Sequence, residues 1–210
     1  MKSFLDCKVI LWDFDGVIMD SMPIRSKGFS LVLKSFPEKQ VKELMDFHDV
    51  NGGLSRYYKF RYFFETIRNE TITEERVQEL AQSFSVIMLE SLINEDLLIQ
   101  DSVSFIKRNW QNYNMHIVSG SDGKELRHIC ESLDLAKYFK SINGSPTHKN
   151  ELVRALLEEN DYDKNQVVLI GDSKNDFEAS MVNGIRFIGY NNEDLKVLSN
   201  SYITQLSNEL

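Results

Sequence analysis

Lys8-Val9-Ile10-Leu11-Trp12-Asp13-Phe14-Asp15-Gly16 is the stretch of the sequence that decides the fold. Its first part is a short, mainly apolar run, which predicts a buried strand, and the Asp-Phe-Asp-Gly that follows predicts a loop at the end of that strand. Similar apolar runs recur further along the chain and also end at small or polar residues. These runs are Met115–Val118, Gln166–Ile170 and Ile185–Gly189, with Ser141–Asn143 as a weaker candidate.

Stretches with helical periodicity fill the gaps between these runs. They are Lys124–Leu133, Lys149–Glu159 and Ser173–Val182, and the serine at the start of the last one is a residue type that caps helices. Strands that alternate with helices of about 10–15 residues indicate βαβ units and a parallel sheet. The sequence therefore predicts an α/β fold built on a doubly wound parallel sheet.

The region from about residue 23 to residue 100 breaks this rhythm. It contains four helical runs, which are Ile24–Phe36, Glu38–His48, Ser55–Ile67 and Glu74–Ile93. We interpret residues 21–99 as a second, small helical domain inserted after the first strand, and residues 1–20 and 100–210 as the core domain. The insert also carries an aromatic run, which predicts an apolar interior for it. This run consists of Tyr57, Tyr58, Phe60, Tyr62, Phe63 and Phe64.

Composition narrows the classes of function. The chain has 210 residues and a formal net charge of −8, which disfavours binding to the phosphates of nucleic acids. No stretch approaches the roughly 18–20 apolar residues that cross a bilayer, and residues 1–8 have no signal-peptide architecture, so the default expectation is a cytoplasmic protein. Cys7 and Cys130 fit no metal or redox spacing and are expected to be buried free thiols.

Polar residues with useful chemistry fall at the predicted strand ends. In an open parallel sheet, ligands bind outside the carboxyl ends of the strands. Several carboxylates at one edge repel each other and need a hard cation, and Mg²⁺ commonly bridges carboxylates to a substrate phosphate. A lysine and a hydroxyl beside a helix start suit phosphate oxygens, so the set matches phosphoryl transfer. The residues concerned are Asp13, Asp15, Ser119, Lys149, Asp172 and Asp176.

Four motifs in the chain resemble those of the haloacid-dehalogenase-like hydrolase superfamily. Asp13-Phe14-Asp15-Gly16-Val17 resembles the first motif, and Ser119 in Ile-Val-Ser-Gly-Ser is similar to the second. Lys149 stands where the third-motif lysine is expected, and Gly171–Asp176 resembles the fourth motif. The motifs occur in the expected order and span nearly the whole chain. The resemblance is to the branch of phosphoglycolate phosphatases and β-phosphoglucomutases, which implies that the helical insert is a cap domain.

The resemblance implies a Mg²⁺-dependent phosphoric monoester hydrolase that acts on a small phosphorylated metabolite. Asp13 would be the nucleophile that forms an aspartyl-phosphate intermediate, and Asp15 would be the general acid and base. The metal would be held by Asp13, the backbone carbonyl of Asp15 and Asp172, with Asp176 as a further ligand or as a group that orients the site.

The remaining motif residues would hold the phosphoryl group. The resemblance assigns this role to Ser119, Gly120 and Lys149. Electrostatic reasoning adds two expectations for the carboxylates: Mg²⁺ and Lys149 keep Asp13 ionised, whereas burial and neighbouring carboxylates favour a protonated Asp15.

The cap loop around Gly53-Leu54-Ser55-Arg56 is a candidate for substrate selection. Arg56 and Lys59 are interpreted as contacts for an anionic or hydroxylated leaving group. Cleavage of a phosphonate would need a lysine in the cap, for which Lys27 and Lys59 are candidates. His48, His116 and His128 show no spacing typical of metal ligands, and we interpret them as structural.

Two further functions remain open. Phosphosugar mutases resemble this chain in the Gly-x-Ser-Arg element, but Arg25 stands where their cap-entry histidine would align. A non-catalytic phosphate-binding protein on the same fold is the other alternative, and the presence of both Asp13 and Asp15 disfavours it. The sequence leaves the oligomeric state open, a monomer included.

Overall fold

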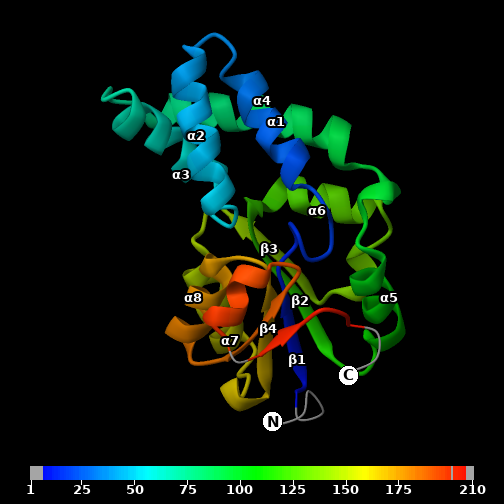
Figure 1. Cartoon of the computed structure of the whole chain (residues 1–210). Helices are drawn as coiled ribbons and strands as arrows, with labels where there is room; N and C mark the ends of the chain where they lie inside the picture. The colour runs from blue at the N-terminus through cyan, green and yellow to red at the C-terminus, as the bar shows by residue number, and fades with distance from the viewer. Residues whose placement is uncertain (1–6, 200, 207–210) are drawn as a thin grey trace.

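A computed structural model describes residues 7–199 and 201–206, and a six-stranded sheet lies at its centre (Figure 1). The strands follow the order β3-β2-β1-β4-β5-β6, and every neighbouring pair is parallel. The N-terminal run before residue 7, on which the expectation of a cytoplasmic location partly rests, lies outside the described residues. The strand bounds are β1 (Val9–Trp12), β2 (Asn114–Asp122), β3 (Ser141–Ser145), β4 (Val167–Gly171), β5 (Arg186–Tyr190) and β6 (Tyr202–Ile203).

Helices cover both faces of the sheet, which confirms the doubly wound α/β prediction. Successive side chains of β1 point to opposite faces of the sheet and are apolar on both. Ile10 and Trp12 belong to one apolar cluster, and Val9 and Leu11 belong to the other, so both faces need helices to cover them. The first cluster includes side chains of α5 (Gln100–Asn109) and α6 (Gly123–Ser132). The second includes side chains of α7 (Lys149–Glu159) and α8 (Lys174–Asn183).

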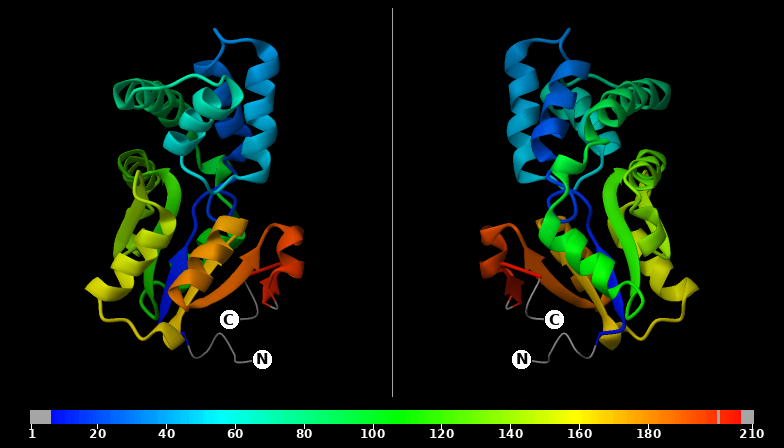
Figure 2. Two further views of the ribbon diagram at one scale, coloured as in Figure 1. Left: turned by 90° about the vertical axis from the view of Figure 1, so that its left-hand side faces the viewer. Right: turned by 90° about the vertical axis from the view of Figure 1, so that its right-hand side faces the viewer.

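The region between β1 and α5 forms a group of helices beyond the carboxyl ends of the strands (Figures 1 and 2). The helices are α1 (Met22–Val32), α2 (Glu38–Val50), α3 (Arg56–Tyr62) with a π-helical turn at Phe63–Ile67, and α4 (Glu74–Leu92). Phe29, Phe60 and Phe84 pack together inside this group. Most of the predicted aromatic run is buried there, although Tyr58 is half exposed. The division at residues 20 and 100 stays a prediction.

The two chain segments that join the insert to the sheet lie side by side. Asp20 N donates to Leu97 O at 2.8 Å, and Ile99 N donates to Ile18 O at 2.9 Å. An antiparallel bridge between Met19 and Leu98 lies between these two bonds. The insert therefore enters and leaves the core at one place.

Two local predictions were wrong. The apolar run that was expected to end at Val118 continues as strand β2 to Asp122, with an irregular register against β3 after Val118. Asp122 caps the helix that follows, because its side chain accepts hydrogen bonds from the N–H groups of Lys124 and Glu125. The helix predicted over residues 55–67 changes to a π-helical turn after Tyr62.

Other features agree with the sequence. Cys7 and Cys130 are both buried and free. Ser173 caps α8 as expected. Within the described part of the chain, the helices are all too short or too polar to cross a bilayer.

Candidate active site

Asp13 lies at the carboxyl end of β1, in the middle of the sheet. Its backbone N–H donates to Ile170 O of β4 at 2.9 Å, and β2 lies on the other side of β1. The chain order reverses at this point of the sheet, which is where ligands bind in such folds. Lys149, at the start of α7, reaches back to the same place, and its Nζ donates to Asp13 Oδ1 at 2.9 Å. The structure thus brings together two predicted residues that are far apart in the sequence.

Three carboxylates form the cluster in which the sequence predicts a metal. One oxygen each from Asp13, Asp172 and Asp176 lies within 4.8 Å of the others. The loop after β1 comes close to the cluster at Gly16, which has a φ of +75° and where a Cβ would lie 1.9 Å from Asp172 Oδ2. Only glycine allows both this conformation and this approach.

The loop after β5 supports the cluster from outside. The side-chain amide of Asn191 donates to Gly16 O at 2.9 Å, and that of Asn192 donates to Asp172 O at 2.7 Å. These two bonds fix the backbone on which Asp172 stands relative to the loop after β1. No motif marks the two asparagines in the sequence, so their role became visible only in the structure.

The buried carboxylates of the cluster are short of positive charge. Burial, and then the charge of Asp176, raise the pKa of Asp13 to about 7, although Lys149 opposes the shift. Burial and the charges of Asp13 and Asp176 raise the pKa of Asp172 well above its usual value. Lys149 alone therefore does not hold Asp13 ionised. Closely spaced carboxylate oxygens that share a single lysine as counter-charge are a donor set that suits a hard divalent cation such as Mg²⁺.

Asp176 uses both of its oxygens within the protein. One oxygen contacts Lys149 Nζ. The other accepts hydrogen bonds from the N–H and the hydroxyl of Ser173, at 3.0 and 2.7 Å, in a capping box at the start of α8. This arrangement favours Asp176 as the group that orients Lys149, the second of the two roles considered for it.

Asp15 points to a different set of partners. Its Oδ1 accepts from Arg25 Nε at 2.6 Å and from the Ser21 hydroxyl, and its Oδ2 accepts from the Ser121 hydroxyl at 2.5 Å. Burial would raise the pKa of Asp15, but the charge of Arg25 and these hydrogen bonds outweigh it, so that the pKa lies below its usual value. The expectation of a protonated Asp15 was wrong, because sequence reasoning did not foresee the Arg25 ion pair.

Ser119 and Gly120 follow the apolar run of β2, but they lie within the strand, which continues to Asp122. Ser119 is buried, and its hydroxyl accepts a hydrogen bond from Ser121 N at 3.1 Å. A Cβ at Gly120 would lie 2.2 Å from Gly53 O, so the absence of a side chain lets the loop at Gly53 lie directly on β2. Whether these residues hold a phosphoryl group stays a prediction.

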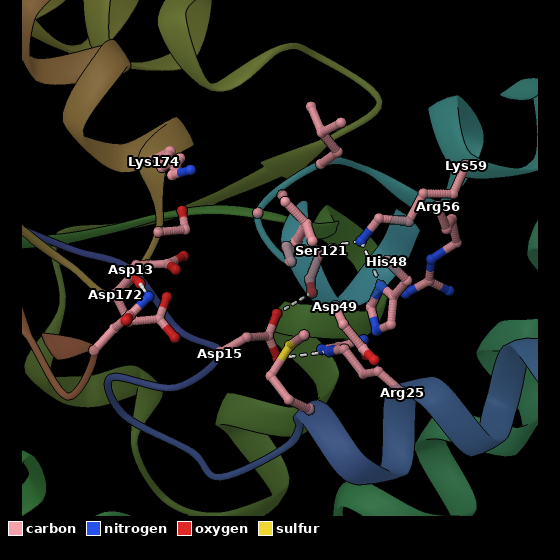
Figure 3. A pocket seen from close by; sticks show the side chains of 18 of the residues that line it. Asp13, Asp15, Arg25, His48, Asp49, Arg56, Lys59, Ser121, Asp172 and Lys174 are labelled. Atoms are coloured by element: carbon pink, nitrogen blue, oxygen red, sulfur yellow. Dashed lines mark hydrogen bonds and ion pairs between the residues drawn. The ribbon is translucent and has the colours of Figure 1, made fainter. Parts of the chain in front are cut away.

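A cavity of about 400 Å³ lies between the ends of the strands and the insert (Figure 3). The sheet side contributes the carboxylates of Asp13, Asp15, Asp172 and Asp194, and the insert contributes polar side chains opposite them. Figure 3 shows these groups on two sides of one space, with Asp15 between them. The charged and imidazole side chains on the insert side are Arg25, His48, Asp49, Arg56 and Lys59.

The two candidate cap residues differ in their surroundings. The Arg56 guanidinium donates to both oxygens of Glu125 on α6 at 2.7 Å and to the Ser85 hydroxyl at 2.7 Å. Lys59 Nζ instead lies 2.7 Å from His48 Nδ1 and 3.0 Å from Gly52 O. Arg56 thus links the insert to the core, and the assignment of either residue to substrate stays a prediction.

Four residues of the site were not selected from the sequence. Arg25 and Ser121 hold Asp15, Glu125 pairs with Arg56 and also with Arg25 Nη1 at 3.2 Å, and His48 contacts Lys59. Arg25 carried one usable signal, since it is a cation close behind the first motif. Glu125 lies 100 residues from Arg25, and sequence periodicity alone does not predict such a pair.

Known proteins share both the sequence pattern and the fold. The family model for haloacid dehalogenase-like hydrolases matches residues 10–190. The chain is 26% identical over 187 residues to a 5'-nucleotidase of Pseudomonas aeruginosa, and the match covers 86% of this chain and 80% of the relative. It is 22% identical over 192 residues to a phosphoglycolate phosphatase of Aliivibrio fischeri, with 86% and 82% coverage.

A solved structure with the same arrangement is the β-phosphoglucomutase of Clostridium difficile. The TM-score is 0.75 at 14% identity, and the alignment covers 95% of this chain and 92% of that one. Because the alignment covers nearly the whole chain, the agreement in fold includes both the sheet and the insert. The match of the family model to most of the chain shows that this protein belongs to the haloacid dehalogenase-like hydrolases.

Proposed function

We propose that this protein is a Mg²⁺-dependent phosphatase that hydrolyses a small phosphomonoester through a phosphorylated Asp13. The observation that carries the proposal is the placement of Asp13 at the sheet centre, with Lys149 on one of its oxygens and Asp172 beside it. The names of the two sequence relatives, a 5'-nucleotidase and a phosphoglycolate phosphatase, agree with a small phosphate ester as substrate.

Asp13, Asp172 and the backbone carbonyl of Asp15 would hold the cation. Four carboxylates, all buried or partly buried, face two buried cations here, so a divalent ion would balance the charge of the cluster. The carboxylates are Asp13, Asp15, Asp172 and Asp176, and the cations are Arg25 and Lys149. When bound, the ion neutralises charge on the transferring phosphoryl group and keeps the nucleophile ionised.

Asp13 attacks phosphorus in the first half of the reaction. A bond forms between a carboxylate oxygen of Asp13 and phosphorus, the bond from phosphorus to the ester oxygen breaks, and Asp15 gives its proton to the leaving oxygen. Because Arg25 holds Asp15 ionised in this structure, the Asp15 carboxyl must separate from Arg25 and bind a proton before this step. Lys149 and the Ser119–Gly120 segment hold the phosphoryl oxygens.

Water hydrolyses the phosphorylated Asp13 in the second half. The ionised Asp15 takes a proton from the water as the water oxygen bonds to phosphorus, and the Asp13 carboxylate leaves. The Arg25 ion pair favours this form of Asp15. The ionised Asp15 therefore suits the hydrolysis of phosphorylated Asp13 as it stands, whereas the attack by Asp13 requires Asp15 to bind a proton first.

Turnover of p-nitrophenyl phosphate by the purified protein tests the proposal. We expect release of p-nitrophenol with Mg²⁺, loss of the activity with EDTA and recovery on addition of excess Mg²⁺. Asp13→Asn should lower kcat by about 10³-fold or more, because it removes the nucleophile. Radiolabel from a labelled phosphate ester should be retained on the wild-type chain after acid quench and not on Asp13→Asn. Activity that persists in Asp13→Asn would refute the mechanism.

A further inference from the structure

Lys59 is a cation buried within the insert wall of the cavity. Its exposed fraction is 2%, and its Nζ contacts only neutral groups, which are His48 Nδ1 at 2.7 Å and Gly52 O at 3.0 Å. Figure 3 shows the amine turned toward the cavity and His48. Among the described residues, no carboxylate lies within ion-pair distance of Lys59.

The other buried cations around the cavity all have carboxylate partners. Arg25 pairs with Asp15, Arg56 pairs with Glu125, and Lys149 pairs with Asp13. Burying an ammonium without a counter-ion is costly, whereas burying a paired one is far less so. Lys59 is therefore the exception that calls for a partner from outside the protein.

Two further donors on the same wall lack partners. His48 Nε2 and Arg25 Nη2 are both buried and form no hydrogen bond in the described part of the chain. When Lys59 donates to His48 Nδ1, the ring proton must lie on Nε2, which makes this atom a donor. Both residues line the cavity with Lys59. Two donor atoms without an acceptor and one ammonium without a counter-charge thus belong to residues that line the space opposite the carboxylates.

The charge state of Lys59 follows from its surroundings. Burial lowers the pKa of Lys59 to about 7. Among the charged groups that face it, Asp15 and Asp49 raise the pKa, whereas Arg25 and Arg56 lower it. A group with such a pKa is about half charged at neutral pH, and an anion bound beside it would favour the protonated form.

We propose that Lys59, together with His48 and Arg25, binds a second anionic group on the leaving group of the substrate, and that Lys59 takes up a proton as this group binds. The proposal rests on the phosphatase function proposed above and names its substrate class, a phosphomonoester with a carboxylate or a second phosphate. Arg56 is excluded from this role because Glu125 occupies both ends of its guanidinium.

Three small phosphomonoesters test whether the site prefers a carboxylate, a second phosphate or a leaving group without charge. They are 2-phosphoglycolate with a carboxylate, ethylene glycol bisphosphate with a second phosphate, and ethyl phosphate with neither. We expect kcat/KM to be higher for an anionic substrate than for ethyl phosphate, and Lys59→Met to lower that ratio by about tenfold or more. The anionic substrate with the larger loss identifies the group. An unchanged ratio in Lys59→Met would refute the site.

Matched variants separate recognition from general effects. Lys39→Met removes an exposed lysine of α2, outside the cavity, and should leave the ratio unchanged. Lys59→Gln is a second variant, which keeps a hydrogen-bond donor without the charge and should also lose the preference. In the wild type the ratio of kcat/KM for an anionic substrate to that for ethyl phosphate should decline above pH 7, because Lys59 must take its proton from a more basic solution. A preference that is constant from pH 7 to pH 9 would contradict proton uptake.

Calorimetry tests the site without turnover. Asp13→Asn is titrated with 2-phosphoglycolate, ethylene glycol bisphosphate or ethyl phosphate in Mg²⁺ at pH 7.5, in two buffers of different ionisation enthalpy. We expect about three-quarters of a proton more to be taken up for an anionic ligand than for ethyl phosphate, and this excess to vanish in Asp13→Asn/Lys59→Met. An excess that survives the second substitution would refute the site. Uptake that depends on Lys59 in a protein without phosphatase activity would refute the phosphatase alone.

Discussion

Gly16 connects the first motif to the position of the Asp172 carboxylate. Its φ of +75° costs an alanine about 1 kcal/mol, and a Cβ would overlap Asp172 Oδ2 at 1.9 Å. We expect Gly16→Ala to displace Asp172 and to lower kcat/KM by about 100-fold or more, with weaker dependence on Mg²⁺. Steady-state kinetics across a range of Mg²⁺ concentrations measures both effects.

Gly184 provides the matched control for this substitution. It also has a positive φ, of +68°, but its nearest potential contact is Lys164 Cδ at 4.0 Å, well away from the carboxylates. Gly184→Ala should lower the free energy of unfolding by about 1 kcal/mol and leave kcat/KM unchanged. Equal kinetic losses in the two variants would show that strain, and not contact with Asp172, explains the effect.

The residues of the sheet side could be predicted from the sequence because their positions follow from the fold. Asp13, Lys149 and Asp172 stand at strand or helix ends, and a parallel sheet brings such ends together. The protonation of Asp15 could not be predicted, since it depends on Arg25, whose side chain is placed by the packing of α1. A contact of that kind carries no period or spacing in the sequence.

At the scale of elements, the pairing of α3 with α6 holds the insert against the sheet. Arg56 of α3 donates to both oxygens of Glu125 on α6, and its guanidinium also stacks 4.5 Å from the centre of the Phe84 ring on α4. Both charges are buried, so each depends on the other for compensation.

Glu125→Gln should loosen this contact. It leaves Arg56 buried without a counter-charge, which costs about 3–5 kcal/mol when the partner is removed in a closed structure. Opening of the insert relieves the cost, so we expect faster amide hydrogen exchange in residues 52–62 and a higher KM. Arg56→Met/Glu125→Gln should recover part of the lost stability. Unchanged exchange in this segment would mean that the ion pair does not control the position of the insert.

The elements themselves were largely predictable, and the exceptions have a physical cause. α7 begins and ends at the predicted residues because its apolar face has a clear helical period. β2 extends past its apolar run because Asp122 pairs with Ser145 of β3 after a shift in register, which the character of Ser119 to Asp122 does not indicate. Tertiary hydrogen bonds of this kind are absent from any local pattern.

At the scale of the whole molecule, a metal ion bound by the carboxylate cluster would stabilise the fold. A cation that binds only the folded chain should stabilise it by about 2.7 kcal/mol at 100 times its Kd, which corresponds to a rise in Tm of roughly 5–10 °C for a protein of this size. Thermal unfolding with and without Mg²⁺ measures the rise. Asp172→Asn should abolish most of it. An equal rise in this variant would place the cation elsewhere.

Buried histidines should make the protein sensitive to mild acid. Burial, and then Lys140, lower the pKa of His116 to about 4, whereas its usual value is 6.5. Between these values the unfolded chain binds the proton and the folded chain does not, so stability is complete above about pH 6.5 and declines as the pH falls toward 4. Urea unfolding at pH 7.5, 6.0 and 5.0 measures this decline.

His116→Gln isolates the contribution of this side chain. The variant loses contacts with Ser141 and Tyr162 and should be less stable at pH 7.5, but its stability should decline less between pH 7.5 and pH 5.0. The carboxylates titrate in both proteins alike, so the difference between the two slopes belongs to His116. Parallel slopes would contradict a histidine that is neutral in the folded state.

The adjacent chain segments at Met19 and Leu98 have a consequence for how such a protein can change. Because the two ends of the insert are neighbours, its length and sequence can vary without moving the strands that it joins, and the strand order is kept. A short turn that joins residue 19 to residue 98 would leave all six strands and their covering helices in place. Evolution can therefore exchange the insert without rebuilding the sheet or the carboxylate cluster at its edge.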